Sequence, residues 1–424
     1  MEKHRLKIGC VADDFTGASD IASFMRGRGL ETILCSGIPD TNAGLDRCDV
    51  VVIALKTRSI PAEAAVKECM AAFEYLNSMG VQQLYFKYCS TFDSTRQGNI
   101  GPVLDAALEK FGLEYTLLCP ALPVNGRTVK DGKLFVNGIP LHETHMKDHP
   151  LNPMWDCDIS VLMREQSRYP CFAISVGDML RGREYVAEKM AAFRKSSKHF
   201  YIVPDYYDDA HAELIYSIFG DLKLLSGGSG LMGNRLLGAE SAHETVDVPE
   251  ASGKTLLLAG SCSKMTLEQI SEYKKTGNTM IKIYPDKVLD GSQDADSVWR
   301  EAENIDRALI YSSDTAEAIS AIAKDKREEA AKRIEKLMAE LAERAIQAGY
   351  KQIIVAGGET SGAVTERIGL KSYLIGESIA AGVPIMVPTE HAELRLVLKS
   401  GNFGKADFFA KAVKMTTEGN RGII

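Results

Sequence analysis

Short apolar runs recur along the chain, and each ends in glycine, aspartate, serine, asparagine or arginine before a segment with helical spacing begins. This alternation predicts strands that alternate with helices, as in an α/β fold with mainly parallel sheets. The predicted strands of the first half are 7–12, 50–55, 84–88, 116–119, 171–176, 200–203 and 223–225. Those of the second half are 255–259, 280–284, 308–311, 352–356, 384–387 and 395–398. Helical spacing is clear at 62–79 and 100–111.

A polar segment separates the two groups of strands. Residues 238–253 are acidic and rich in Gly, Ala and Ser, with Pro249 near their end, which is typical of a linker. We therefore expect a domain at 1–237, a linker at 238–253 and a second domain at 254–424. Each half is long enough for its own core, since domains have roughly 100–200 residues. The expected architecture is two domains, each a mainly parallel sheet flanked by helices, with a ligand cleft between them.

Two segments interrupt the alternation. Residues 320–348 alternate in charge and carry apolar residues at helical spacing, which predicts a long helix with a solvated face. Residues 124–159 form a polar excursion that contains His142, His145 and His149, and a loop of that length is usually functional. Prolines keep these histidines off one helix face, so we interpret them as substrate-loop or incidental residues in preference to a zinc site.

Composition narrows the class of protein. Apolar residues make up 45% and charged residues 25% of the chain, as in soluble globular proteins. The net charge of −7 lacks the basic field of duplex-binding proteins, so we expect no nucleic-acid partner. Nine cysteines without a C-x-x-C spacing favour a reducing compartment. No run approaches ~18 apolar residues and the N-terminus turns acidic early, so we expect a cytoplasmic protein without a membrane partner.

Polar side chains follow the predicted strands of the first half. The carboxyl ends of parallel strands meet at one edge of a sheet, where ligands bind. The residues at this edge include Asp13, Asp14, Thr16, Lys56, Arg58, Ser90, Thr91, Asp93, Asn125, Arg127 and 227–230. Carboxylates accept protons and arginines bind carboxylates, so the set indicates a pocket for a small polyhydroxy acid, although solvated loops are polar without any ligand. Asp13 and Asp14 are the sharpest signal, because a helix cap needs only one carboxylate.

Three loops rich in glycine and serine follow strands of the second half. Residues 355–363 have the pattern of a strand, a glycine turn and a helix start that carries Thr360 and Ser361. The backbone N–H groups of such a turn and the helix N-terminus favour an anion, so we expect a phosphate site. Similar loops occur at 260–263 and 400–404. Together the three loops indicate a nucleotide site.

Two other motifs do not fit their context. Gly253-Lys254-Thr255 looks like the end of a P-loop, but Val248 stands where a P-loop has glycine and a strand follows. Residues 228–233 match G-x-G-x-x-G, yet they lead into the predicted linker and not into a βαβ unit. A dehydrogenase is therefore a remote alternative. A non-catalytic sugar-acid sensor is another, although a sensor would not need the three glycine loops.

A resemblance to a known family depends on five segments in combination, which are 12–20, 89–94 with 98–101, 120–127, 227–230 and 356–362. In this order they resemble the four-carbon acid sugar kinase family, over most of the chain. The resemblance implies an N-terminal domain that binds a four-carbon sugar acid and a C-terminal domain that binds ATP, with phosphoryl transfer to the terminal hydroxyl. Segments 134–136, 149–154 and 398–404 are most similar to the 3-oxo-tetronate kinase branch. Residues 142–144 are closer to the threonate kinases, so D-threonate and D-erythronate kinases stay open as alternatives.

The resemblance and the chemistry of phosphoryl transfer together suggest roles for single residues. Asp13 or Asp14 is the candidate catalytic base, and Glu359 is a candidate ligand of Mg²⁺. The candidate substrate-binding residues are Thr16, Arg58, Lys87, Ser90, Asn125, Gly126, Arg127, Gly228 and Ser229. The candidate nucleotide-binding residues are Ser261, Ser263, Gly357, Gly358, Glu359, Thr360, Gly401 and Gly404. We expect ATP and Mg²⁺ as cofactors and a small sugar acid as the substrate, and the chain is a candidate homodimer.

Overall fold

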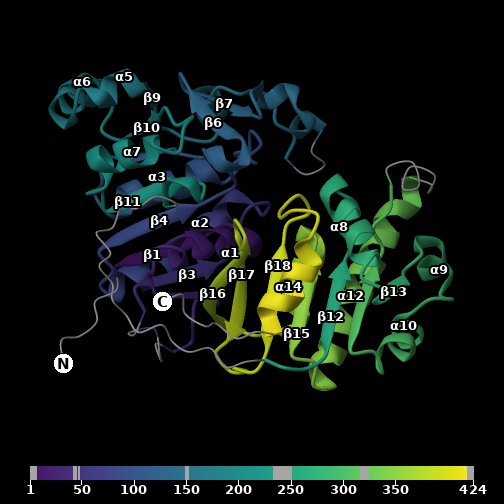
Figure 1. The fold of residues 1–424 in the computed structure, drawn as a ribbon. Coiled ribbons are helices and arrows are strands. Elements are labelled where there is room, and N and C mark those ends of the chain that lie inside the picture. The colour runs from purple at the N-terminus through teal and green to yellow at the C-terminus, as the bar shows by residue number, and fades with distance from the viewer. Residues whose placement is uncertain are drawn as a thin grey trace, which may run out of the picture. The chain divides into compact units, whose positions relative to one another are not determined.

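The computed structural model describes residues 7–41, 45, 48–148, 152–232, 251–315 and 324–417. The chain divides into two compact units, Met1–Ser241 and Ala242–Ile424 (Figure 1). Most of the predicted linker 238–253 lies outside the described residues, as do His149 and residues 320–323. No helix within the described ranges combines the length and the apolar character needed to cross a bilayer.

The main sheet of the N-terminal unit is parallel, with the strand order β11-β4-β1-β3-β2. Its strands are β1 (Ile8–Ala12), β2 (Thr32–Ser36), β3 (Val50–Ala54), β4 (Gln83–Lys87) and β11 (Leu224–Gly227). Every residue of β1, β3 and β4 is buried, because a parallel sheet is covered on both faces. Helices α1 (Phe15–Arg26) and α2 (Ala62–Ser78) pack on this sheet, and α3 (Ile100–Lys110) packs on α2.

Two smaller sheets complete the N-terminal unit. One is parallel and is formed by β5 (Tyr115–Leu117), β10 (Phe200–Pro204) and β9 (Cys171–Ile174). The other is antiparallel and is formed by β6 (Arg127–Lys130), β7 (Lys133–Val136) and β8 (Ile139–Pro140). The remaining helices of this unit are α4 (Ile159–Arg164), α5 (Val176–Leu180), α6 (Arg183–Ser196) and α7 (His211–Phe219).

The antiparallel sheet corrects the interpretation of 124–159 as a polar excursion. Asp131-Gly132 and Asn137-Gly138 connect its strands, and all four residues have positive φ angles between 51° and 79°. Asp-Gly and Asn-Gly are the dipeptides that two-residue hairpin turns prefer, since both positions adopt a left-handed conformation. The signal for two hairpins was therefore present in the sequence, although the strands between the turns are too short to show a clear alternation.

The C-terminal unit contains a mixed sheet with the order β16-β17-β18-β15-β12-β14-β13. The strands are β12 (Thr255–Ala259), β13 (Thr279–Lys282), β14 (Arg307–Tyr311), β15 (Gln352–Ala356), β16 (Ser372–Ala380), β17 (Val383–Pro388) and β18 (Arg395–Lys399). The pairs from β18 to β13 are parallel, and β16 and β17 are antiparallel. The helices are α8 (Lys264–Lys274), α9 (Pro285–Asp290), α10 (Ala295–Ala302), α12 (Lys324–Gln347), α13 (Gly358–Ile368) and α14 (Phe408–Thr417).

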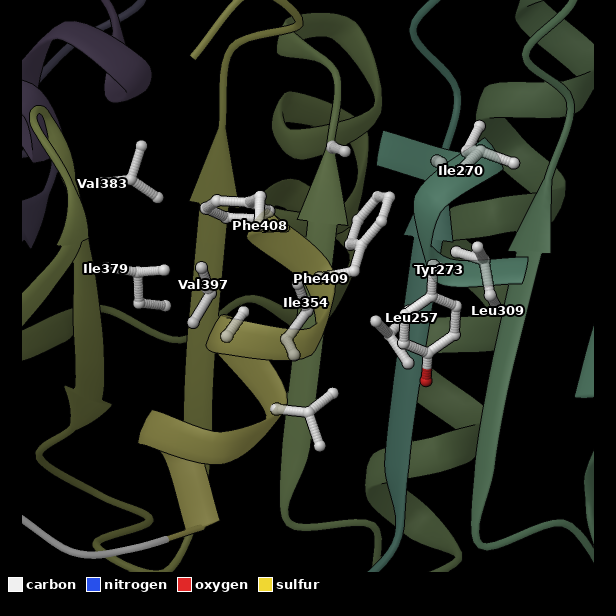
Figure 2. Close-up of a cluster of buried hydrophobic side chains, with 14 of the residues drawn as sticks. Leu257, Ile270, Tyr273, Leu309, Ile354, Ile379, Val383, Val397, Phe408 and Phe409 are labelled. Carbon is white, nitrogen blue, oxygen red and sulfur yellow. The ribbon is translucent and has the colours of Figure 1, made fainter. Parts of the chain in front are cut away.

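The core of the C-terminal unit lies between this sheet and helices α8 and α14 (Figure 2). Phe408 and Phe409 of α14 pack over Ile354 and neighbouring strand residues, and Tyr273 of α8 packs on the same layer. The intervening residues of β12 and β15 are equally buried, so the sheet is covered on both faces. Burial of this kind contributes roughly 25 cal/mol per Å² of apolar surface and fixes the strand ends that carry the glycine loops.

The predicted α/β class with two domains is confirmed. The prediction for 352–356 coincides with β15, and the predicted helix at 320–348 corresponds to α12. Strands β2 and β16 were not predicted. Strand β16 carries polar residues and shifts its register against β17, so its sequence lacks a regular alternation.

Candidate active site

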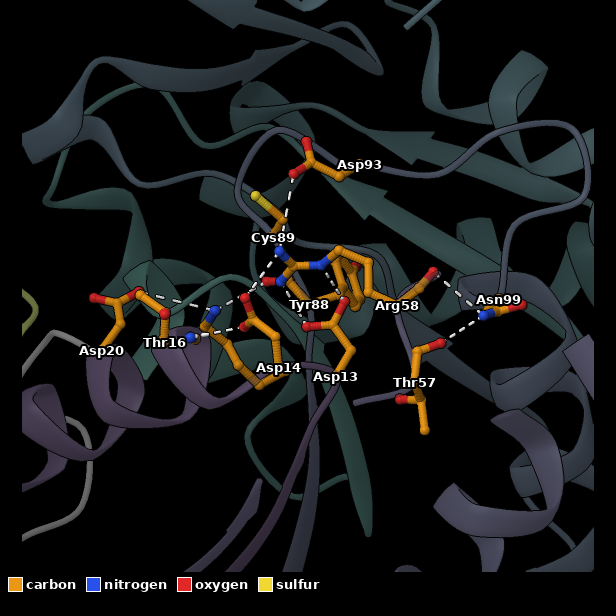
Figure 3. A network of polar contacts seen from close by, with 12 residues as sticks. Asp13, Asp14, Thr16, Asp20, Thr57, Arg58, Tyr88, Cys89, Asp93 and Asn99 are labelled. Carbon is orange, nitrogen blue, oxygen red and sulfur yellow. Dashed lines mark hydrogen bonds and ion pairs between the residues drawn. The ribbon is translucent and has the colours of Figure 1, made fainter. Parts of the chain in front are cut away.

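Three carboxylates surround one arginine at the carboxyl ends of β1, β3 and β4 (Figure 3). Arg58 donates from Nε to Oδ2 of Asp13 at 2.9 Å and from Nη2 to Oδ1 of Asp13 at 2.8 Å. Its Nη1 lies 3.0 Å from Oδ2 of Asp14 and 4.0 Å from Oδ2 of Asp93. We call Asp13, Asp14, Arg58 and Asp93 the arginine cluster. The parallel register of the three strands brings these distant residues together.

Backbone hydrogen bonds hold the arginine cluster in place. The carbonyl oxygen of Asp13 accepts from the backbone N–H groups of Thr57 at 3.0 Å and Arg58 at 3.3 Å. Asn99, the residue before α3, donates from Nδ2 to the carbonyl oxygens of Thr57 at 2.5 Å and Ile60 at 2.9 Å. The loop that carries Arg58 is thus fastened to the end of β1 on one side and to α3 on the other.

The electrostatics of the cluster favour a permanent ion pair. Burial raises the pKa of Asp13 above its usual range, although Arg58 lowers it. Burial by itself lowers the pKa of Arg58, but the charges of Asp13 and Asp14 outweigh burial and leave that pKa well above its ordinary value. Protein carboxylates therefore engage Nε, Nη1 and Nη2 of Arg58. This arrangement differs from the expectation that Arg58 clamps a substrate carboxylate, because its donors are already directed at the protein.

Asp14 is the more accessible member of the aspartate pair. Its side chain is 31% exposed, compared with 8% for Asp13. Oδ1 of Asp14 accepts from the backbone N–H of Gly17 at 2.7 Å and so caps helix α1. A Cβ atom at Gly17 would collide with Oδ1 of Asp14 and reach 3.0 Å from Nζ of Lys87. Glycine at position 17 therefore leaves space for both charged groups.

A second polar group lies next to the arginine cluster. Ser229 donates from Oγ to Oδ2 of Asp20 at 2.6 Å, and Nζ of Lys87 lies 3.8 Å from the same oxygen. Burial raises the pKa of Asp20, although Lys87 and Ser229 lower it. Oδ1 of Asp20 is buried and has no hydrogen-bond partner among the described residues. Asp20 was not singled out in the sequence, because it sits inside α1 and not at a strand end.

Several other predicted residues border this group. Thr16 lies in the first turn of α1, between Asp14 and Asp20 in Figure 3. A Cβ atom at Gly228 would approach the carbonyl oxygen of Pro120 to 2.6 Å and Cβ of Ser90 to 3.6 Å. The close approach of backbone segments explains why glycine follows β11.

Asn125, Gly126 and Arg127 lie where a short 3₁₀ turn leads into the antiparallel sheet. Asn125 ends a short 3₁₀ turn, Gly126 follows with φ of 74°, and Arg127 begins β6. Arg127 donates from Nη1 to the carbonyl oxygen of Asn125, and its buried Nε has no partner among the described residues. Within the described part of the chain, no hydrogen bond or ion pair joins Arg127 to the arginine cluster. Among the described residues, Nε of Arg127 is therefore left without an acceptor, whereas Nε of Arg58 donates to Asp13.

The C-terminal unit contains a pocket of about 1240 Å³ at the carboxyl ends of its strands. The glycine turn Gly357, Gly358, Glu359 and Thr360 lines it at the start of α13, together with Ser261. Because the sequence predicts a nucleotide site at this turn, we name the cavity the nucleotide pocket. The lining also includes Tyr284 just before α9, Leu289 of α9, and Ala330, Ala331 and Ile334 of α12. The pocket thus combines backbone donors at a helix N-terminus with an apolar wall. The predicted solvated helix at 320–348 contributes to that wall, which periodicity alone did not indicate.

Structural reasons explain why glycine occupies positions 357 and 401. Gly357 has φ of 136°, a conformation that L side chains rarely adopt. A Cβ atom at Gly401 would collide with Oγ of Ser261 and lie 2.9 Å from Oγ of Ser263. Gly358, in contrast, has open space where its Cβ would be. Turn geometry therefore fixes Gly357 and Gly401, whereas Gly358 is open toward the pocket.

The remaining predicted nucleotide residues support the pocket from behind. Ser263 caps α8, where its Oγ accepts from the backbone N–H of Thr266 at 3.2 Å. Gly404 has φ of 81° and packs against Phe408, so it does not line the pocket. Gly401 reaches the pocket only through its contact with Ser261.

Two carboxylates of the nucleotide pocket lie close enough to interact. Burial, and then the charge of Glu359, raise the pKa of Glu335 above its usual range. Carboxylate oxygens are the protein ligands that Mg²⁺ prefers, with water and phosphate completing its shell. The residues present therefore fit a divalent cation beside the glycine turn.

His142, in the segment 124–159, lies near two other side chains that could bind a metal ion. His142, Asp156 and Cys157 place one ligand atom each within 4.8 Å of one another. His142 is partly exposed, and Asp156 already accepts from two backbone N–H groups. The side chain of His145 and all of His149 lie outside the described residues.

Family models match both units. A sugar-binding N-terminal domain matches residues 8–235, and a nucleotide-binding C-terminal domain matches residues 256–409. These two matches correspond to the unit with the arginine cluster and the unit with the nucleotide pocket.

Individual relatives are similar over nearly the whole chain. A curated protein of Brucella melitensis named 3-oxo-tetronate kinase is 41% identical over 98% of this chain and 97% of its own. A Pectobacterium atrosepticum protein of the same name is 40% identical over 96% of this chain and 99% of its own. Among solved structures, a Salmonella typhimurium LT2 protein provisionally described as a tRNA synthase has a TM-score of 0.88 and 39% identity, covering 96% of this chain and 99% of its own.

Proposed function

Because this chain belongs to the four-carbon acid sugar kinase family, we propose that it transfers the γ-phosphoryl group of ATP to the 4-hydroxyl of 3-oxo-tetronate. The nucleotide pocket carries this proposal, since it combines a glycine turn at a helix N-terminus with an apolar wall within one unit. The names of relatives that are about 40% identical support the choice of 3-oxo-tetronate over other four-carbon acids.

We assign each part of ATP to a different surface of the nucleotide pocket. The apolar wall with Leu289, Ala330 and Ile334 suits the adenine ring. The backbone N–H groups of the Gly357–Thr360 turn suit the phosphates, because the helix N-terminus carries a partial positive charge. Glu359, beside Glu335, would hold Mg²⁺, which neutralises charge on the phosphate oxygens when bound.

The N-terminal unit supplies the groups for the acceptor. Asp14 is the residue we assign as base or hydroxyl-orienting group, since it is the more exposed carboxylate of the pair. Arg58 would hold Asp13 and Asp14 in place and would not contact the substrate carboxylate. Lys87 and Arg127 are the cations that we assign to the anionic substrate. Phosphoryl transfer requires mainly positioning and charge stabilisation, so these side chains are sufficient for the acceptor side of the reaction.

The test is a comparison of acceptors by ADP release with ATP and Mg²⁺. We expect the highest kcat/KM with 3-oxo-tetronate and lower values with D-threonate and D-erythronate. A preference for D-threonate or D-erythronate would keep the kinase and correct its substrate. ATP binding without ADP release for any of the three acids would contradict the proposed reaction, and sugar-acid binding without ATP binding would favour a sensor.

A further inference from the structure

Lys399 is the last residue of β18, and its side chain is completely buried in the C-terminal unit. Lysine is almost never fully buried unless its charge is paired. Nζ of Lys399 donates to the carbonyl oxygens of Gly401 at 2.8 Å and Ser400 at 3.0 Å, and to Oγ1 of Thr266 at 3.2 Å. An ammonium group has three N–H donors, and each has one acceptor here.

These contacts connect Lys399 to two glycine turns of the nucleotide site. Its backbone carbonyl accepts from the N–H of Gly357 at 2.9 Å, so it fixes the turn that lines the nucleotide pocket. Its side chain fixes the turn at Gly401, which packs against Ser261. Thr266 closes the arrangement because its hydroxyl donates to the carbonyl oxygen of Gly401 at 2.9 Å. One residue therefore joins both turns.

The surroundings of the ammonium group are neutral. Thr266 faces it from α8, the carbonyl groups of Ser400 and Gly401 face it from the loop, and the Phe408 ring of α14 lies 5.6 Å away. Burial lowers the pKa of Lys399 to about 7. A neutral amine has two N–H donors and a lone pair, so it would leave one of the three acceptors facing that lone pair. The protonated form therefore satisfies every N–H of the group with one acceptor.

We propose that the protonated ammonium group of Lys399 positions the Gly357 and Gly401 turns for the phosphates of ATP and adds a positive charge near them. The inference rests on the proposed function in that it takes ATP as the ligand of this pocket. Lys399 acts as a positioning residue, because it has no exposed surface with which to touch the nucleotide.

The test compares ATP binding by the wild type and by Lys399→Met, which keeps the length of the side chain and removes the charge. Calorimetry should show ATP binding weakened about 10-fold or more, as for a lost charged hydrogen bond, and 3-oxo-tetronate binding unchanged. Lys411→Met is the matched control, since Lys411 also donates to a backbone carbonyl in the same unit, but its acceptor Ile379 belongs to β16 and not to a glycine turn. The control should bind ATP as the wild type does.

A pH series separates positioning from a merely structural role. Protonated Lys399 declines as pH rises through about 7, so wild-type ATP affinity should fall between pH 6 and pH 8.5 relative to the Met variant. The titration of ATP itself is common to both proteins and cancels. Equal ATP affinity and equal pH dependence in the two proteins would overturn the inference while leaving the proposed function intact. A wild type that binds no ATP at any pH would overturn both.

Thr266→Val provides a second variant if Lys399→Met does not fold. It keeps the lysine and removes one of its three acceptors, so ATP binding should weaken in the same direction but less. Wild-type ATP affinity in a folded Thr266→Val protein would count against the proposed arrangement.

Discussion

Arg58 and Asp13 form a bidentate ion pair, with two parallel hydrogen bonds of 2.8 and 2.9 Å between the guanidinium and the carboxylate. Both oxygens of Asp13 already accept from Arg58 and its side chain is only 8% exposed, whereas Asp14 meets Arg58 through Oδ2 alone and stays 31% exposed. Adjacent aspartates thus have different environments. Asp13 therefore holds Arg58 in place, whereas Asp14 is accessible to a substrate. The sequence alone did not distinguish these two roles.

The first prediction concerns Asp14→Asn. The amide oxygen of Asn can accept the hydrogen bond from Gly17 and so preserve the cap of α1. Its NH₂ group then faces Nη1 of Arg58, so we expect a folded protein with a moderately lower melting temperature. Asn cannot accept a proton from the substrate hydroxyl, so kcat should fall by about 10²–10⁴-fold. Steady-state kinetics with thermal denaturation tests this, and near-normal kcat in Asp14→Asn would exclude it as the base.

Asp13→Asn should have the opposite profile. It breaks the bidentate pair and leaves a buried guanidinium with reduced compensation, a change that costs up to about 3–5 kcal/mol in buried pairs. Denaturant unfolding should therefore show lower stability than for Asp14→Asn. If Asp13→Asn unfolds like the wild type and loses turnover, the two aspartates have exchanged roles relative to our assignment.

The nucleotide pocket is tested by Gly358→Val. The open space at Gly358 means that the fold tolerates a side chain there, but the side chain would occupy the pocket. ATP affinity measured by calorimetry should fall about 10-fold or more, equivalent to about 1.4 kcal/mol, with sugar-acid binding retained. Gly362→Val is the matched control, because Gly362 lies in the same helix with open space and does not line the pocket. Undiminished ATP affinity in Gly358→Val would remove the turn from the nucleotide site.

The strand ends and the glycine turn could be predicted because each depends on a short stretch of sequence. β15 and its turn are one continuous segment, and the acids after β1 follow a buried apolar run directly. The burial of Lys399 could not be predicted in this way. A lysine at a strand end is ordinarily solvated, and it is buried here only because α8 and α14 cover it.

Asp20 illustrates the same limit in the N-terminal unit. Its partner Ser229 follows β11, near the other end of the unit's sequence, and the two meet only once β11 pairs with β4. The hairpins in 124–159 are a different case. Their Asp-Gly and Asn-Gly turns were visible, but strands of two to four residues are too short for periodicity to identify.

Arg127→Met tests the assignment of that side chain to the substrate. Its buried Nε lacks a partner among the described residues, so a substrate carboxylate or hydroxyl would satisfy it. Loss of a charged hydrogen bond should weaken sugar-acid binding by roughly 1.5–3 kcal/mol and leave ATP affinity unchanged. The exposed Arg164→Met in the same unit serves as control and should change neither. Unchanged sugar-acid affinity in Arg127→Met would place the carboxylate site elsewhere.

The last prediction contrasts two buried aspartates of the N-terminal unit. Asp105 accepts from the hydroxyls of Tyr201 and Ser167 and from the backbone N–H of Arg168, so donors face both of its oxygens. Asp20 accepts from Ser229 through Oδ2, and its Oδ1 has no partner among the described residues. At position 105, the NH₂ group of an Asn would face a hydrogen-bond donor. At position 20, Asn would instead remove a negative charge that has few compensating contacts.

Substitution by Asn should accordingly have opposite effects on stability. Asp105→Asn should lose roughly 1–3 kcal/mol, since one donor is left without an acceptor. Burial raises the pKa of Asp20, so the Asp20 carboxyl keeps its proton to a higher pH in the native state than in the unfolded state. The stability of the wild type therefore falls as pH rises from the unfolded-state pKa to the native-state pKa. Asp20→Asn removes this loss, so its melting temperature should rise relative to the wild type as pH increases above the ordinary range of an aspartate pKa. Turnover should nevertheless fall about 10-fold, because Lys87 loses its charged neighbour at the substrate site. Thermal denaturation across pH with parallel kinetics decides the matter, and an Asp20→Asn protein that is less stable at pH 7 would show that the carboxylate is fully compensated.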